Sequence, residues 1–157
     1  ALAAAAGLAC AVPEAPDAPP PHLRPGRLLA KQQAGAHLAV LNHVASPERT
    51  RDFVRAARDI GVSIPIVVSV AVYTDARSAA VLRNFPGLQL DPVAVDRVLS
   101  APDPLAAGID AAVDEARSLL EIPGVAGINL SGLASGRSEL AGAEIKAVIG
   151  ERIRSGR

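Results

Sequence analysis

Short apolar runs alternate along this chain with longer segments in which apolar residues recur at helical spacing. The run SIPIVVSVAV is apolar and largely β-branched, which is typical of a strand buried on both faces. Three shorter runs have the same character, and the first of them ends at Pro13. We therefore expect strands at residues 7–12, 37–42, 63–72 and 124–130.

The segments between these runs carry the start and stop signals of helices. Ser46 can cap a helix whose first turn holds Pro47, and Gly61 stops that helix. The Asp-Pro pairs at 91–92 and 103–104 repeat the capping signal, and the second pair begins a long apolar stripe. We expect the main helices at 27–34, 47–60, 74–85, 104–120 and 143–154.

The resulting order is strand, helix, strand, helix, strand, two helices, strand, helix. This alternation predicts a parallel α/β sheet covered on both faces, either open and doubly wound or part of a (β/α)₈ TIM barrel. No Gly-rich nucleotide-binding turn or Walker motif follows any predicted strand, which disfavours the open sheet. A whole barrel needs about 250 residues. We therefore expect residues 1–157 to form half of one barrel domain, and the absence of methionine indicates a processed chain or a piece of a longer one.

Composition narrows the function classes. Sixteen basic and sixteen acidic residues cancel, so the clustered positive charge that nucleic acids require is missing. Cys10 is the only cysteine, which excludes an internal disulfide and makes the reducing cytoplasm the simplest location. No apolar run approaches the roughly 20 residues of a membrane span. The proline-rich segment 13–26 is typical of a stiff loop or linker.

Three segments together resemble the C-terminal half of methylenetetrahydrofolate reductase. They are LLAKQQAGAHLAVLNHV, FVRAARDIGVSIPIVVSVAVY and AAGIDAAVDEARSLLEIPGVAGINLSG, and the resemblance extends in order and spacing over the whole chain. It implies a TIM barrel of which this chain supplies the C-terminal four β/α units. It also implies reduction of 5,10-methylenetetrahydrofolate to 5-methyltetrahydrofolate by NADH or NADPH, normally through FAD. The catalytic acid would then lie in the N-terminal half, which is absent from this chain.

The resemblance also assigns roles to individual residues. Lys31 falls on a lysine that helps to hold the flavin, and Asn42 falls on a glutamine that contacts folate and nicotinamide. Val12 and Pro16 replace a tyrosine and a histidine that contact the flavin, and Ser131 replaces a tyrosine at the end of the last strand. The lost contacts predict that FAD binds weakly or not at all. Hydride would then pass directly from the nicotinamide to the folate.

Each candidate also has an ordinary structural interpretation. Asn42 follows a strand, where barrels place ligand-facing groups, but it can instead bond its own loop. His43 is a further candidate binding residue beside Asn42, but its side chain should point the other way, as that of a loop histidine. Lys31 can be a solvated residue at a helix end. Glu14 is a candidate because it lies in a loop that the family places near the flavin. Ser131 and Gly132 open NLSGLASGRSE, which resembles a phosphate-binding loop, although its glycines also permit tight turns. Tyr73 can stack on a ligand ring or simply pack. No residue pattern predicts a metal site.

We therefore predict a methylenetetrahydrofolate reductase-like oxidoreductase, with this chain inactive on its own. The alternatives are a non-catalytic folate- or nucleotide-binding barrel fragment and a phosphate-binding barrel enzyme of another class. The expected partners are a folate and the other half of the barrel. The oligomeric state stays open, and a half barrel alone is expected to dimerise or aggregate through its open sheet edges.

Overall fold

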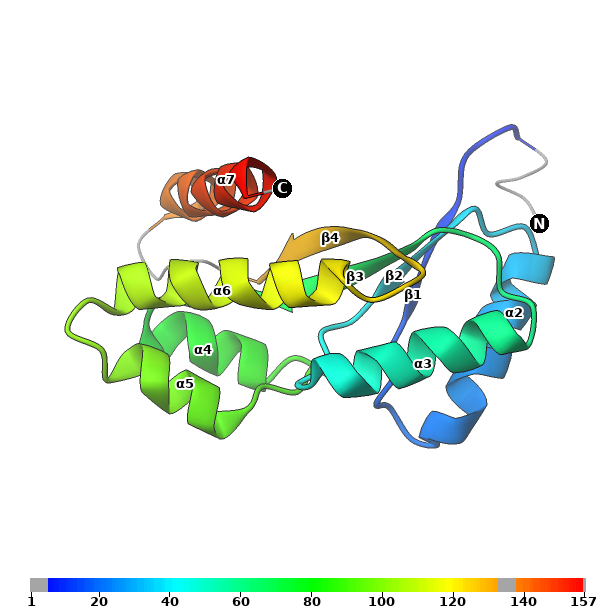
Figure 1. The fold of residues 1–157 in the computed structure, drawn as a ribbon, viewed down its shortest axis with the longest axis horizontal. Helices are drawn as coiled ribbons and strands as arrows, with labels where there is room; N and C mark the ends of the chain where they lie inside the picture. Colours follow the sequence, from blue (N-terminus) through cyan, green and yellow to red (C-terminus); the bar gives the residue numbers. More distant parts are fainter. Residues whose placement is uncertain (1–5, 133–137, 157) are drawn as a thin grey trace.

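The computed structural model describes residues 6–132 and 138–156. Four parallel strands form one sheet in the order β1-β2-β3-β4 (Figure 1). They span Ala11–Glu14, Leu38–Leu41, Ile66–Ala71 and Val125–Ser131. Sequential order with no reversal is the arrangement of a barrel wall, whereas a doubly wound sheet reverses its order at a switch point. The α/β class with alternating units is therefore confirmed, and the open doubly wound alternative is wrong.

The first strand begins later than its sequence predicts. The expected strand ended before Pro13, but β1 runs through Pro13 to Glu14. Proline is tolerated there because β1 is an edge strand that pairs only with β2, so the sheet does not need the missing N–H group. The shift matters for function, because it places Glu14 inside the sheet rather than in a loop.

In the described part of the chain, one 3₁₀ turn and five α-helices connect the strands, and a sixth α-helix follows β4. Three helices, rather than the expected two, lie between β3 and β4, because the capped segment at 91–92 forms its own short helix. The helix predicted at 74–85 starts after Asp75 rather than at Thr74, since Asp75 and Ser78 form a reciprocal capping box. The helices are η1 Pro21–Leu23, α2 Arg24–Gln33, α3 Pro47–Asp59, α4 Ala76–Arg83, α5 Pro92–Leu99, α6 Pro104–Leu120 and α7 Glu139–Ser155.

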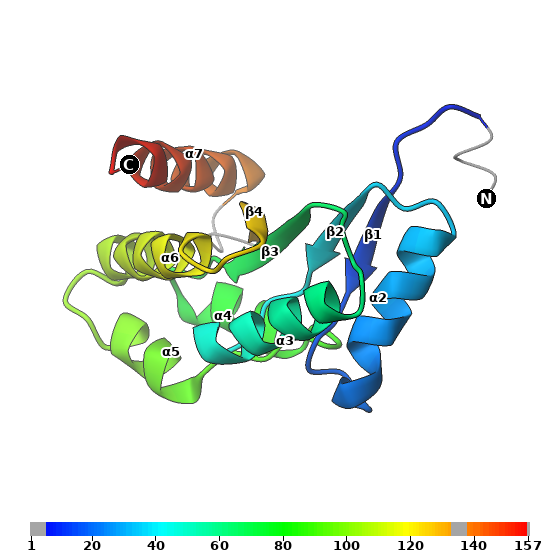
Figure 2. The ribbon, with the colours of Figure 1, turned by 45° about the vertical axis from the view of Figure 1, so that its right-hand side comes forward.

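The main core lies between the sheet and a layer of helices on one side of it. Figure 2 shows α2, α3 and α6 along the same side of the sheet, with α7 packed beside α6. Alternate strand residues such as Leu41, Ile66 and Val68 are fully or almost fully buried against this layer. The residues between them, among them Val40 and Val67, face the other way and are only partly buried. The expected cover on both faces is therefore confirmed in part for the described residues. The long helices cover one face, and α4 covers the carboxyl end of the other, where Ala71 packs with Ala79 and Leu82.

Polar side chains fasten the loops at the amino ends of the strands. The Arg58 guanidinium donates to the carbonyl oxygens of Val62, Ile64 and Gly124, each at 2.8 Å. One side chain of α3 thus holds the turn that follows α3 and the turn that precedes β4. Within the described part of the chain, no helix combines the length and apolarity that crossing a membrane requires.

Candidate functional site

A cavity of about 370 Å³ opens at the carboxyl end of the sheet, on the face away from the long helices. We call it the strand-end pocket. Barrel proteins bind their ligands at this end of the strands, and the volume lies in the range of small-molecule sites. Its polar lining consists of Asn42, His43, Ser69, Asn129 and Ser131. Its apolar lining includes Val40, Val81, Leu82, Phe85 and Leu88.

The strand alternation brings these polar groups together. Asn129 and Ser131 are two residues apart on β4, so both point to the same face. The Asn129 amide donates to the Ser69 hydroxyl at 3.1 Å, and the Ser131 hydroxyl donates to the Val70 carbonyl at 3.2 Å. Ser69 and Asn129 were not among the sequence candidates. Their signal was present, because each is a polar residue within an otherwise apolar run.

Asn42 contributes a side-chain amide to the lining of the strand-end pocket. Its backbone N–H donates to the Glu14 carbonyl at 2.8 Å, which continues the pairing of β1 with β2. Its side-chain amide makes no hydrogen bond to any described residue, although it lines the cavity. Both the donor and the acceptor of this amide are therefore available to a ligand.

Gly132 closes the rim of the pocket after β4. Its φ of +91° favours glycine, and a Cβ atom there would lie 2.7 Å from Leu82 Cδ2. The positive φ and the close approach to α4 explain why a glycine occupies this tight turn. Residues 133–137, with Gly136 and most of the suggested phosphate loop, lie outside the described residues, so a phosphate site there stays a prediction.

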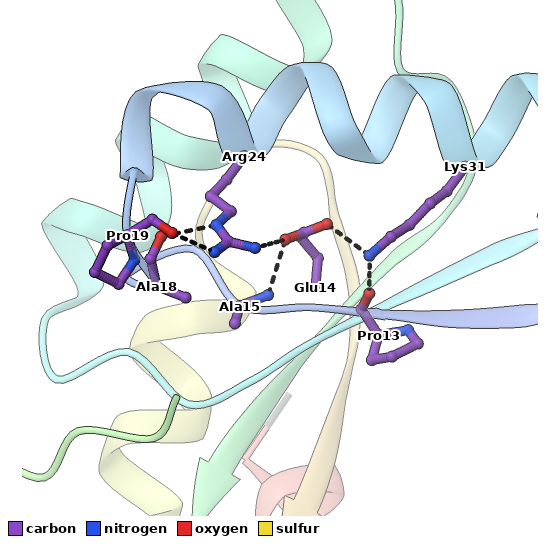
Figure 3. Close-up of polar contacts among 7 residues, drawn as sticks. All are labelled: Pro13, Glu14, Ala15, Ala18, Pro19, Arg24 and Lys31. Carbon is purple, nitrogen blue, oxygen red and sulfur yellow. Dashed lines mark hydrogen bonds and ion pairs between the residues drawn. The ribbon is translucent and has the colours of Figure 1, made fainter. Parts of the chain in front are cut away.

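Glu14 and Lys31 lie on the opposite face of the sheet from Asn42. Glu14 is the register partner of Leu41, so its side chain points into the helix-covered side, where the carboxylate is 1% exposed. Lys31 Nζ on α2 lies 2.7 Å from one carboxylate oxygen and also donates to the Pro13 carbonyl (Figure 3). The structure thus joins Glu14 to Lys31, but it does not bring either to the strand-end pocket.

Arg24 completes this cluster from the first turn of α2. Its guanidinium lies 3.4 Å from the other oxygen of Glu14 and donates to the carbonyls of Ala18 and Pro19 (Figure 3). The Ala15 N–H group also reaches this oxygen, at 3.2 Å. A buried carboxylate with two cationic partners and a backbone donor is well satisfied, so the cluster anchors β1 to α2.

His43 points away from Asn42, as the alternation predicts, and forms a wall of the pocket. Its Nδ1 lies 2.8 Å from the Gln89 carbonyl and its Nε2 lies 2.8 Å from Glu115 Oε1 on α6. Burial lowers the pKa of His43, but the hydrogen bond and charge of Glu115, the Gln89 carbonyl and the charge of Asp17 outweigh it, so the pKa is raised. A protonated ring donates to both acceptors, which leaves neither nitrogen for a ligand.

The likeness of this chain to known proteins lies in its fold. No protein-family model matches the chain, and no curated protein matches it. A solved structure described as an uncharacterized protein from Clostridium thermocellum that binds two copies of 5-methyl-5,6,7,8-tetrahydrofolic acid matches with a TM-score of 0.73 at 14% identity. The match covers 96% of this chain and 55% of that chain. The likeness shows the fold of the present chain, which spans about half the length of that protein.

Among the described residues, no group of histidine, cysteine, aspartate and glutamate side chains is arranged to hold a metal ion. The fold and the strand-end pocket together define an α/β protein with a cavity at the carboxyl end of a parallel sheet. The resemblance to methylenetetrahydrofolate reductase stays a prediction at the level of the family.

Proposed function

We propose that this chain binds a reduced folate, with the pterin ring in the strand-end pocket. The observation that carries the proposal is the Asn42 amide, which has no hydrogen-bond partner among the described residues and lines a cavity with apolar walls and a few polar groups. The edge of a pterin ring presents adjacent donors and acceptors, and a primary amide can pair with both kinds. The solved protein of the same fold, which binds 5-methyltetrahydrofolic acid, supports this class of ligand.

The remaining lining suits a flat ring. Leu82 and Leu88 offer apolar contact to the faces of the ring, while Asn129 and Ser131 supply further polar atoms at its edge. Phe85 is 56% exposed at the rim, where an aromatic side chain can pack against the part of the ligand that leaves the pocket. This combination of apolar walls and a few placed polar groups is typical of small-molecule sites.

Reduction of the folate is a finer proposal, which the family resemblance suggests. The described lining of the strand-end pocket contains one ionisable side chain, His43, and both of its ring nitrogens are engaged. We therefore propose binding without turnover for this chain by itself. Hydride transfer from NADH or NADPH would require an acid from outside the described lining. Methylenetetrahydrofolate-dependent oxidation of NADH by the 157-residue chain alone would contradict this proposal.

We also infer that the chain does not hold FAD through the positions that the resemblance assigns. Lys31 is tied to Glu14 under α2, and Val12 packs against the helix-side core. Neither residue reaches the open face of the sheet, so the residues present do not fit a flavin. Protein purified with a stoichiometric flavin absorbance would refute this inference.

Titration calorimetry of the full-length protein with (6S)-5-methyltetrahydrofolate tests the proposed function. We expect saturable binding, and Asn42→Ala should weaken it about tenfold through loss of the amide contacts. Gln33→Ala is the matched control, because it removes an exposed amide from α2 far from the pocket. Absence of binding, or equal affinities of Asn42→Ala and the unmodified protein, would contradict the proposal.

A further inference from the structure

The connection between α4 and α5 forms part of the wall of the strand-end pocket. We call residues 85–90 of this connection the strap. Phe85 and Leu88 of the strap belong to the lining of the pocket. Gly87 has a φ of +77°, and a Cβ atom built on it would lie 3.5 Å from the side-chain nitrogen of Asn42. The strap therefore lies directly against the amide that the proposed function assigns to the ligand.

The strap is weakly attached to the rest of the described chain. Phe85 and Gln89 are exposed, and Leu88 and Leu90 are half-buried against the apolar cluster of α4 and α5. Apart from its turns with α4 and within itself, its backbone makes one hydrogen bond to the described residues. In that bond the Gln89 carbonyl oxygen lies 2.8 Å from His43 Nδ1. A segment with so few buried contacts opens at a small cost in free energy.

His43 can hold the strap and α6 together only as a cation. Its two ring nitrogens face two acceptors, the Gln89 carbonyl and Glu115 Oε1, each at 2.8 Å. A neutral ring carries one N–H group, so it can satisfy only one of these acceptors. Because the carboxylate is charged, it is the stronger acceptor and keeps that N–H group. Loss of one proton thus turns a lone pair toward the Gln89 carbonyl and breaks its bond to His43.

The charged and titratable groups that face His43 come from several elements. Asp17, in the loop after β1, pairs with Arg49 through one carboxylate oxygen, and its other oxygen has no partner among the described residues. Behind the ring lies a cavity between α5 and α6, whose titratable lining consists of Tyr73, Asp91, Arg97, Asp114 and Glu115 besides His43 itself. Burial lowers the pKa of His43, but Glu115, the Gln89 carbonyl and Asp17 raise it by more. We therefore expect the ring to lose its proton above a pH of about 6.5.

We propose that the strap is a movable cover of the strand-end pocket, that the doubly protonated His43 ring holds it closed, and that loss of one ring proton releases it. In the closed form, Phe85 and Leu88 lie against the ligand, and release removes these apolar contacts. His43 is then a positioning residue, which acts on the ligand through Gln89. The inference rests on the proposed function for the identity of the ligand, but the motion of the strap needs no ligand.

A tryptophan on the strap reports its motion in the absence of ligand. The chain contains no tryptophan and Phe85 is 56% exposed, so Phe85→Trp places one indole ring on the strap without disturbing the core. The fluorescence emission maximum of the full chain is followed from about pH 6 to about pH 9. We expect it to shift with a midpoint at the pKa of His43. Glu115→Gln in the same background should move the midpoint to lower pH, because it removes the charge that favours the cation and keeps an acceptor.

Asp114→Asn is the matched control for Glu115→Gln. It removes the same charge from the adjacent residue of α6, where Asp114 is exposed and makes no hydrogen bond to His43. We expect its midpoint to stay near that of Phe85→Trp alone. An emission maximum that does not change with pH would overturn the proposal, as would equal midpoints in Glu115→Gln and Asp114→Asn.

Calorimetry over the same pH range connects the strap to binding. We expect the affinity of the unmodified protein for (6S)-5-methyltetrahydrofolate to fall about fivefold as the pH rises through the transition, because part of the protein then lacks the contacts of the closed strap. In Glu115→Gln the fall should occur at lower pH. An affinity that is independent of pH while the strap moves would overturn the proposal. A strap that moves with pH in a protein that binds no folate at any pH would refute the proposed function and leave the control of the strap by His43 standing.

Discussion

Replacing Lys31 by methionine should destabilise the protein and leave its folate affinity unchanged. The family resemblance assigns this lysine to a flavin, whereas the structure ties it to the buried carboxylate of Glu14. Methionine retains much of the apolar part of the side chain but removes the ammonium group that reaches Pro13 and Glu14 on β1. The substitution therefore separates a structural role of the lysine from a ligand-binding role.

The structure sets the magnitude of this effect. A hydrogen bond to a charged group contributes about 1.5–3 kcal/mol, and the low end applies because Lys31 is 31% exposed at its side chain. Glu14 keeps Arg24 at 3.4 Å and the Ala15 N–H group at 3.2 Å, so its charge does not become unpaired. The larger penalty of an isolated buried charge therefore does not apply. We expect the free energy of unfolding to fall by about 1.5 kcal/mol.

Urea unfolding measures the coupling free energy between Lys31 and Glu14. The four proteins compared are the unmodified chain, Lys31→Met, Glu14→Gln and the double variant. Because the two groups are in direct contact, the effects of the single changes should not add, and we expect a coupling of about 1 kcal/mol. Calorimetry on the same four proteins should give equal affinities for 5-methyltetrahydrofolate. Additive stabilities together with a loss of affinity in Lys31→Met would refute the structural role of this lysine.

Three further predictions follow from the other contacts. Because the pKa of His43 is raised on folding, protonation stabilises the folded protein below about pH 6.5, and this contribution is lost as the pH rises through the folded pKa. His43→Gln should remove that pH dependence of the urea midpoint. A midpoint that changes with pH as in the unmodified protein would contradict a stabilising His43–Glu115 pair. Arg58→Lys should lower the free energy of unfolding by about 2 kcal/mol, since an ammonium group cannot reach all three carbonyl oxygens that the guanidinium contacts. Equal urea midpoints of Arg58→Lys and the unmodified protein would disprove this prediction. Gly132→Ala should lower the free energy of unfolding by about 1–3 kcal/mol, because alanine would be strained at a φ of +91° and its Cβ atom would clash with Leu82. A variant with the same melting temperature as the unmodified protein would contradict this prediction.

The order of elements could be predicted because its signals are local. Ser46, Asp91 and Asp103 each cap a helix that begins with proline, as the sequence indicates. The bounds of β1 could not be predicted, because the local rule for Pro13 depends on whether the strand lies at an edge. That information comes from pairing between distant segments.

The candidate site could be predicted only where its residues carry local signals. Asn42 and Ser131 follow from strand ends, and they do meet in one pocket. Whether Glu14 faces the ligand side or the helix side depends on its register with Leu41, which one sequence does not show. Tyr73 and Asp114 line one cavity, between α5 and α6, and no spacing in the sequence indicates this.

The most direct test of the account is a crystal structure of the full-length protein with (6S)-5-methyltetrahydrofolate. The account predicts electron density for the pterin ring in the strand-end pocket, within hydrogen-bond distance of the Asn42 amide and beside Ser131. A pterin ring bound elsewhere on the protein, or no folate density in crystals grown with saturating ligand, would contradict it.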